Sequence, residues 1–93
     1  MVIDVECLLF DDRNEAKLEA NRVTLVDVEG VFERHPRFYV NRGNRRASHV
    51  MIGTTRRGRT LVIPIEALGD GVWRPVTAFK PTPQQAARYR RFG

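Results

Sequence analysis

Turn-forming residues divide the stretch from residue 37 to residue 79 into four short segments that are rich in β-branched and aromatic residues. These segments predict strands over residues 37–42, 47–55, 59–66 and 72–79. Strands joined by such short turns pair as antiparallel neighbours, because a parallel connection needs a much longer crossover. The spacing therefore predicts a four-stranded meander. Pro64 and Pro75 are expected at an edge or a bulge, because proline has no N–H group to give to a sheet.

A further strand and a helix are expected before the meander. Apolar and acidic residues alternate imperfectly over Ile3–Leu9, which predicts a short strand. Asp11-Asp12 ends this strand and caps a helix over about residues 12–21. Cys7 lies within the apolar run, and we expect it to be a buried thiol with no catalytic role.

The spacing of a helix capping box, a hydroxyl residue followed three positions later by an acid or amide, marks two more helices. It occurs at Thr24 with Asp27 and at Thr82 with Gln85. The first pair predicts a helix over residues 25–33, and the second predicts a helix from Pro83 to about Arg91. The expected fold is a single α+β domain over residues 1–93, in which two N-terminal helices and one C-terminal helix cover the sheet.

The charge of the chain is divided along its length. Residues 1–33 hold nine acids and three bases, whereas residues 34–93 hold thirteen bases and two acids, Glu66 and Asp70. Fourteen of the sixteen bases are arginine, whose planar guanidinium binds phosphate through two hydrogen bonds and stacks on bases. With a pI of about 10.3, this pattern favours a nucleic acid as the partner, and the acidic first third is either a solvated layer or a docking surface for a basic protein.

Several classes of protein are not favoured. No apolar run is long enough for a membrane-spanning helix, and the acidic N-terminus is unlike a signal peptide. A single cysteine forms no internal disulfide, and His35 and His49 do not have the spacing of metal ligands. We therefore expect a cytoplasmic protein with no metal and no small-molecule cofactor.

Two stretches resemble a known family. Residues 51–63, MIGTTRRGRTLVI, are similar to the "IG-x-T-x-x-GR-x-L-x-V" hairpin of BrnT-like toxins, and residues 73–82, WRPVTAFKPT, are similar to the "RIISARKAT" strand of that family. Tyr89 falls where the last helix of the family carries a tyrosine. The chain departs from the family at Phe79, where the family has arginine, and at Gln85, where it has glutamate.

The resemblance implies a RelE-like fold and a bacterial type II toxin. Toxins of this kind are small, metal-independent ribonucleases that a cognate antitoxin protein holds inactive. The resemblance therefore implies RNA as the substrate and an antitoxin as the protein partner. The competing interpretation is a non-catalytic module of the same fold that binds nucleic acid or protein.

Metal-free cleavage of RNA needs a base, an acid and cations that stabilise the charge on the phosphorane. Arg46, Arg59 and Arg74 lie near the starts of three neighbouring predicted strands. We expect their guanidiniums to converge on one phosphate across one face of the sheet.

The candidates for the acid and the base are His49, Lys80 and Tyr89. The imidazole of His49 can do either task near neutral pH, although a histidine packed beneath a helix is an equally good interpretation. Lys80 is a base if burial lowers its pKa, and otherwise an exposed phosphate contact. Tyr89 is a weak base unless nearby arginines lower its pKa, and it can equally stack on a base or cover the sheet.

The remaining arginines are expected to contact RNA phosphates without sequence preference. They include Arg45, Arg56, Arg57 and Arg88. The first three occupy predicted turns, and Arg88 lies in the basic last helix, which suits either RNA or an acidic segment of an antitoxin.

Overall fold

The computed structural model describes residues 3–42 and 46–92, and the side chains of residues 88–92 lie outside the description. The helices are α1 (Asp12–Ala20), α2 (Leu25–Glu33) and α3 (Pro83–Phe92). The strands are β1 (Cys7–Leu8), β2 (Arg37–Val40), β3 (His49–Thr54), β4 (Thr60–Gly69) and β5 (Val72–Pro75). The described residues form a five-stranded sheet with the strand order β1-β5-β4-β3-β2.

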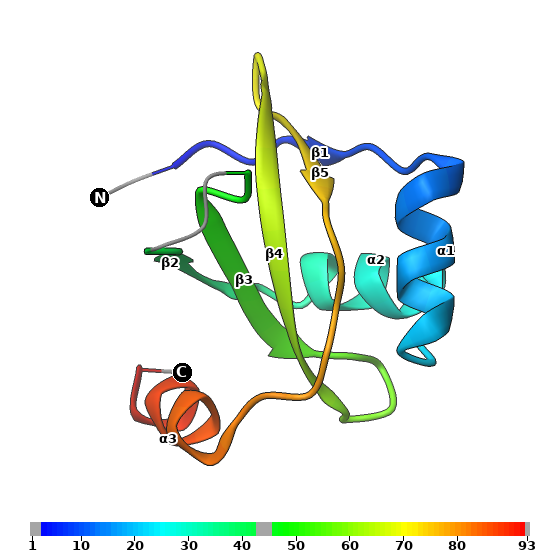
Figure 1. Cartoon of the computed structure of the whole chain (residues 1–93). Coiled ribbons are helices and arrows are strands. Elements are labelled where there is room, and N and C mark those ends of the chain that lie inside the picture. Colours follow the sequence, from blue (N-terminus) through cyan, green and yellow to red (C-terminus); the bar gives the residue numbers. More distant parts are fainter. Residues whose placement is uncertain (1–2, 43–45, 93) are drawn as a thin grey trace.

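Strands β2 to β5 pair in antiparallel fashion as a meander, and β1 joins β5 in parallel (Figure 1). The predicted α+β class and the predicted meander with an added N-terminal strand are therefore confirmed. The N-terminal strand is much shorter than expected, because it pairs only at two positions before the chain turns toward α1. Cys7 lies exposed on this edge strand, so the expectation of a buried thiol is wrong.

The two prolines of the sheet behave differently. Pro64 pairs with Val50 inside β4, which is the central strand, so the expected edge or bulge position is wrong. Its carbonyl oxygen accepts a hydrogen bond of 2.9 Å from the N–H of Val76, which follows the last residue of β5. The nitrogen of Pro64, which has no hydrogen to donate, faces the same side of the strand, beyond the end of β5. Pro75 is the last residue of β5 and lies beyond the two residues of β5 that pair with β1. It therefore lies at an edge of the sheet, as expected.

The final strand was predicted to continue to Phe79, but β5 stops at Pro75. The chain returns to the sheet at Phe79, which exchanges two backbone hydrogen bonds with Val62, at 2.8 Å and 3.0 Å. β4 in turn extends three residues beyond the predicted end at Glu66, and the irregular pairing of this hairpin falls between Ala67 and Gly69.

The three helices begin as predicted because their first N–H groups are capped by side chains. Thr24 and Asp27 form a reciprocal capping box with bonds of 2.9 Å and 3.1 Å, and Thr82 and Gln85 form another. At α1 the cap is Asp11, and its reciprocal partner is Asn14. Local capping thus places each helix within a residue or two of its predicted range.

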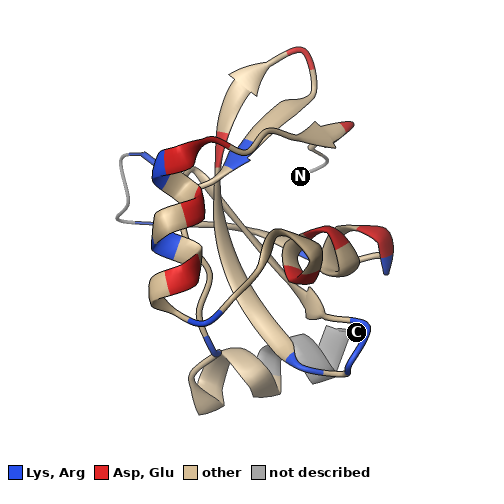
Figure 2. Ribbon diagram, turned by 90° about the vertical axis from the view of Figure 1, so that its right-hand side faces the viewer, with Lys and Arg blue, Asp and Glu red and all other residues tan. Residues whose placement is uncertain are grey.

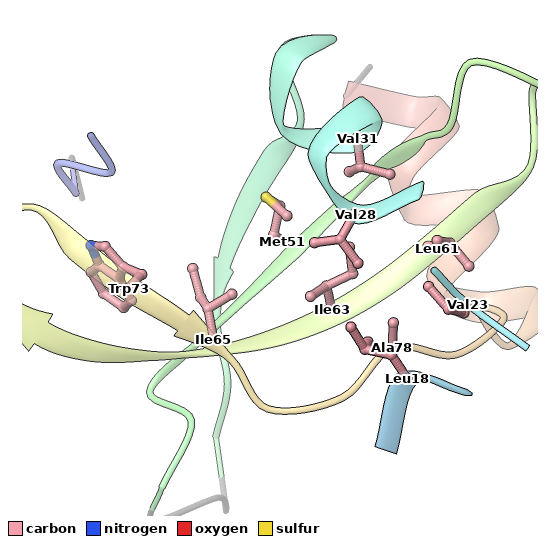
Figure 3. Packing of buried hydrophobic residues seen from close by; sticks show 10 residues of the cluster. All are labelled: Leu18, Val23, Val28, Val31, Met51, Leu61, Ile63, Ile65, Trp73 and Ala78. Atoms are coloured by element: carbon pink, nitrogen blue, oxygen red, sulfur yellow. The ribbon is translucent and has the colours of Figure 1, made fainter. Parts of the chain in front are cut away.

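The hydrophobic core lies between α1, α2 and one face of the sheet (Figure 3). Leu18 of α1 and Val28 and Val31 of α2 pack against the sheet residues Met51, Leu61, Ile63 and Ile65, all nearly inaccessible to solvent. At Gly53 an added Cβ would lie 3.0 Å from the side chain of Val31, so a glycine lets α2 approach β3 closely. α3 lies at the lower end of the sheet in Figures 1 and 2.

Candidate nucleic-acid interface

Basic residues gather on the turn between β3 and β4, whereas α1 and α2 carry most of the acidic residues (Figure 2). A groove of about 450 Å³ lies beside this turn. It is lined by the turn itself and by the connection from α1 into α2, and we call it the arginine groove. Its lining residues are Arg22, Thr24, Val26, Asp27, Thr55, Arg56, Arg57 and Arg59.

Backbone geometry fixes the arginines around the groove. Arg22 has a φ of 59°, which turns the chain from α1 toward α2. Its carbonyl oxygen accepts a hydrogen bond of 3.0 Å from Nη1 of Arg59. On the other wall, the N–H of Arg59 donates to Oγ1 of Thr55 at 3.1 Å, and Gly58 takes a φ of 85° to close the turn. Two segments that are 37 residues apart in the chain are thereby joined at the groove.

The groove is strongly cationic because its guanidiniums are only partly neutralised. Its lining has four arginines and one acid, Asp27, whose carboxylate accepts a hydrogen bond from the N–H of Thr24 as part of the helix cap. Arg56 pairs with Glu33 at 2.8 Å, and this carboxylate raises the pKa of Arg56. Arg22 and Arg57 form no ion pair with any residue that the structure describes. The first residues of α2 also line the groove, and a helix N-terminus favours anions.

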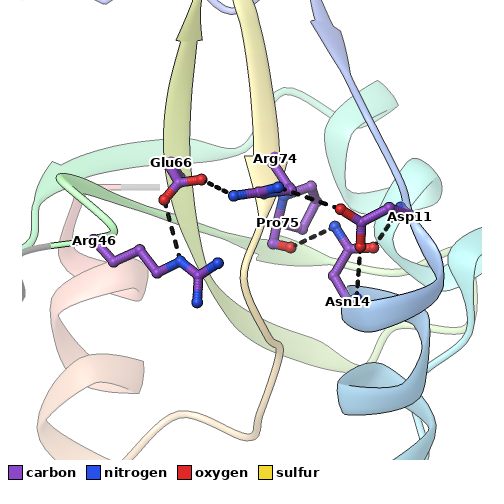
Figure 4. A network of polar contacts seen from close by, with 6 residues as sticks. All are labelled: Asp11, Asn14, Arg46, Glu66, Arg74 and Pro75. Carbon is purple, nitrogen blue, oxygen red and sulfur yellow. Dashed lines mark hydrogen bonds and ion pairs between the residues drawn. The ribbon is translucent and has the colours of Figure 1, made fainter.

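A second group of charges, which we call the Glu66 cluster, consists of Asp11, Arg46, Glu66 and Arg74 (Figure 4). Glu66 pairs directly with Arg74 through Oε1 and with Nε of Arg46 through Oε2 at 3.2 Å. Nη1 of Arg74 also donates to Oδ2 of Asp11 at 3.3 Å. The guanidinium of Arg74 therefore lies between two carboxylates.

These contacts shift the pKa values of the cluster in the direction that favours the charged forms. Glu66, followed by Asp11, raises the pKa of Arg74. The pKa of Asp11 is lowered, chiefly by the hydrogen bond from the N–H of Asn14 and also by Arg74. Asn14 is buried, and its Nδ2 donates to the carbonyl oxygen of Pro75 at 2.9 Å, which ties the cap of α1 to the end of β5.

The expected convergence of Arg46, Arg59 and Arg74 is wrong. Arg46 and Arg74 meet on Glu66, but Arg59 lies at the opposite end of β4 in the arginine groove. Arg59 precedes Glu66 by seven residues of extended chain, which separates them by about 20 Å. Sequence reasoning missed Arg22 and the bridging role of Glu66, although the scarcity of acids after residue 33 marked Glu66 as unusual.

His49 joins neither group of charges. It pairs with Ile65 on the core face of the sheet, whereas Glu66 and Arg74 pair on the opposite face. Its Nδ1 lies 2.9 Å from Oγ of Ser48, and its ring makes a T-shaped contact with that of Trp73, with 5.3 Å between the ring centroids. Its Nε2 is buried without a hydrogen-bond partner among the described residues. This environment fits the structural interpretation of His49 better than the catalytic one.

The other predicted site residues are less informative. Lys80 is exposed, after the bridge that Phe79 makes to β4. Arg45 and the side chains of Arg88 and Tyr89 lie outside the described part of the structure. Within the ranges that are described, no cluster of three or more potential metal ligands occurs, and none of the helices is both long and apolar enough to cross a bilayer.

Comparisons of the chain with protein-family models, with curated proteins and with solved structures found no match.

Proposed function

We propose that this protein binds single-stranded RNA through the sugar–phosphate backbone, and that the arginine groove is the contact surface. The observation that carries the proposal is the set of four arginines that line one groove, where the one acid among the described lining residues is already used in a helix cap. Guanidiniums bind phosphate oxygens strongly, and Arg22 and Arg57 have no ion pair within the described structure to compete with it. We propose RNA rather than DNA because the resemblance to BrnT-like toxins implies RNA as the substrate.

The groove favours recognition of the backbone over recognition of bases. Among the side chains that the structure describes, those lining the groove include no aromatic ring on which a base can stack. Phosphate contacts position a nucleic acid without reading its sequence, so we expect weak sequence preference and a strong dependence on salt.

The test is the affinity for a short RNA oligonucleotide, measured over a series of salt concentrations. The double variant Arg57→Gln, Arg59→Gln should weaken binding by about tenfold or more at low salt and flatten the salt dependence. The matched control is Arg34→Gln with Arg37→Gln, two exposed arginines that do not line the groove. Equal losses in both double variants would show that net charge alone drives binding, and a DNA oligonucleotide of the same sequence tests the choice of RNA.

A second candidate is metal-independent cleavage of RNA, as a BrnT-like, RelE-like toxin paired with an antitoxin. Its support is Arg59, which follows the motif-bearing turn and points a guanidinium donor into the groove wall. A cation at this place stabilises the charge that develops on the phosphorane. The test is digestion of RNA in the presence of a chelator by the wild type and by Arg59→Ala and Arg74→Ala. Cleavage that Arg59→Ala abolishes supports this candidate, and binding without cleavage supports the binding module.

A further inference from the structure

Glu66 is one of only two acids after residue 33, and it lies between two arginines. Its two carboxylate oxygens are divided, with Oε1 on Arg74 and Oε2 on Arg46 (Figure 4). The side chain of Glu66 is 18% exposed, and that of Arg74 is 26% exposed. The carboxylate thus occupies a half-buried position where two guanidiniums converge.

A pair of arginines holds a phosphate group in the same way, with each guanidinium on a separate oxygen of the anion. The recess beside the cluster is lined by four cationic side chains and one acid, and its lining residues are Asp11, Arg13, Asn14, Lys17, Arg46, Arg74, Pro75 and Val76. The recess has a volume of about 20 Å³, which is room for a water molecule. The recess is too small for a phosphate, so a phosphate reaches both guanidiniums only by replacing the carboxylate of Glu66 between them.

We propose that Arg46 and Arg74 form a second phosphate site, which the carboxylate of Glu66 fills and neutralises in the unliganded protein. The inference deepens the RNA-binding proposal and rests on it for the source of the phosphate, a phosphodiester of the bound RNA. Inorganic phosphate offers the same chemistry from a free ion, so it serves as a probe of the site without RNA.

The two sites lie along α1 and β4. The recess is lined by residues from the cap of α1, Asp11, to its last turn, Lys17, and Arg22 just beyond the helix lines the arginine groove. Arg59 of the groove and Glu66 are separated by about 20 Å of extended chain, a distance that one RNA strand of a few nucleotides covers. A strand held in the groove thereby brings a neighbouring phosphate to Glu66 at high effective concentration.

The experiment compares Glu66→Gln with Asp70→Asn, which removes the same charge at the other acid of the basic region. Asp70 lies in the turn between β4 and β5 with a φ of 54°, a conformation that asparagine tolerates well. Binding of inorganic phosphate is followed by NMR through the Nε–H signals of Arg46 and Arg74. Glu66→Gln should tighten phosphate binding by about tenfold, and Asp70→Asn by less than about twofold.

The wild type provides a measurement that does not depend on a variant. Its Arg46 and Arg74 signals should shift saturably with phosphate, at higher concentration than in Glu66→Gln. Equal effects of Glu66→Gln and Asp70→Asn, or unchanged Arg46 and Arg74 signals in both the wild type and Glu66→Gln, would overturn the proposal.

RNA-binding measurements on the same variants distinguish this proposal from the proposed function of the arginine groove. If Arg57→Gln with Arg59→Gln keeps full RNA affinity while Glu66→Gln still gains phosphate binding, the groove proposal fails and the second site stands. If the groove variant loses RNA affinity and Glu66→Gln behaves like Asp70→Asn toward RNA and phosphate alike, the second site fails and the groove stands.

Discussion

The arginine groove and the Glu66 cluster are built from the same type of side chain but differ in how its charge is neutralised. In the cluster, Arg74 lies between two carboxylates and the acids match the cations. In the groove, four arginines share one lining acid, and that acid serves a helix cap. The comparison teaches that the number of arginines alone does not locate a phosphate site. What differs is whether their hydrogen-bond donors are open in the free protein or are held by a carboxylate that a phosphate must displace.

The first prediction concerns Asn14, which holds Asp11 of the Glu66 cluster in place. Asn14→Leu removes the hydrogen bonds to the backbone of Asp11 and Pro75 from a buried position. We expect it to lower the free energy of unfolding by about 2–3 kcal/mol, measured by urea denaturation. Asn21 is exposed at the other end of α1, where its side chain donates to Oγ1 of Thr77. Asn21→Leu should lower the free energy of unfolding by clearly less. Similar losses of stability at both positions would contradict the expected difference between the buried contact and the exposed contact.

The second prediction concerns Arg74. Arg74→Gln leaves Glu66 and Asp11 without their shared cation, so the melting temperature should fall. RNA affinity should fall only modestly, by about threefold, because a phosphodiester must displace Glu66 before it gains Arg74. Thermal unfolding and RNA titration measure the two effects. Arg13→Gln, at the same recess, should leave the melting temperature unchanged. An unchanged melting temperature would show that the pairs of Arg74 with Glu66 and Asp11 do not stabilise the fold, and an unchanged RNA affinity would count against the second phosphate site.

The third prediction follows from the lowered pKa of Asp11. A carboxylate whose pKa is lower in the folded than in the unfolded chain stabilises the fold at neutral pH, and this contribution is lost as the pH falls through the folded pKa. Asp11→Asn keeps a good helix cap but removes the charge. The wild type should therefore be the more stable protein at pH 7, and the difference should begin to shrink at about pH 4, near the unfolded pKa, and vanish only below the lower folded pKa. Urea denaturation at a series of pH values from 7 downward checks this, and a difference that does not decrease in acid would contradict it.

The smallest expected effect compares neighbours in one turn. Arg56 is paired with Glu33, and Arg57 is not paired with any described residue. Arg56→Gln should weaken RNA binding by about twofold or less. In the wild type, Arg56 gives up its exposed ion pair with Glu33 when it contacts a phosphate, and this loss offsets part of the gain. Arg57→Gln should weaken RNA binding more. The reverse order in RNA titrations would show that pairing in the free protein does not predict the contribution to binding.

Local patterns in the sequence predicted the helices well. Thr24 and Asp27 form the predicted capping box, because such a contact depends only on residues three positions apart. The predicted turn around Gly58 is also present, with the positive φ that it requires.

Contacts between strands were not predictable in the same way. Whether Arg59 or Glu66 meets Arg74 depends on the length of β4 and on its register with β5, which an irregularity between Ala67 and Gly69 alters. A shift of one residue sends every side chain to the other face of a sheet. The composition indicated that a basic site exists, but only the register shows which of the arginines belong together.

The pairing of β1 with β5 has a consequence for how the chain folds. Cys7 pairs with Val72, Leu8 pairs with Trp73, and the indole N–H of Trp73 donates to the carbonyl oxygen of Asp4 at 2.8 Å. The last of these contacts joins residues 69 positions apart in sequence, and closing so long a loop is slow. During synthesis the first strand therefore waits, unpaired, until almost the whole domain has left the ribosome.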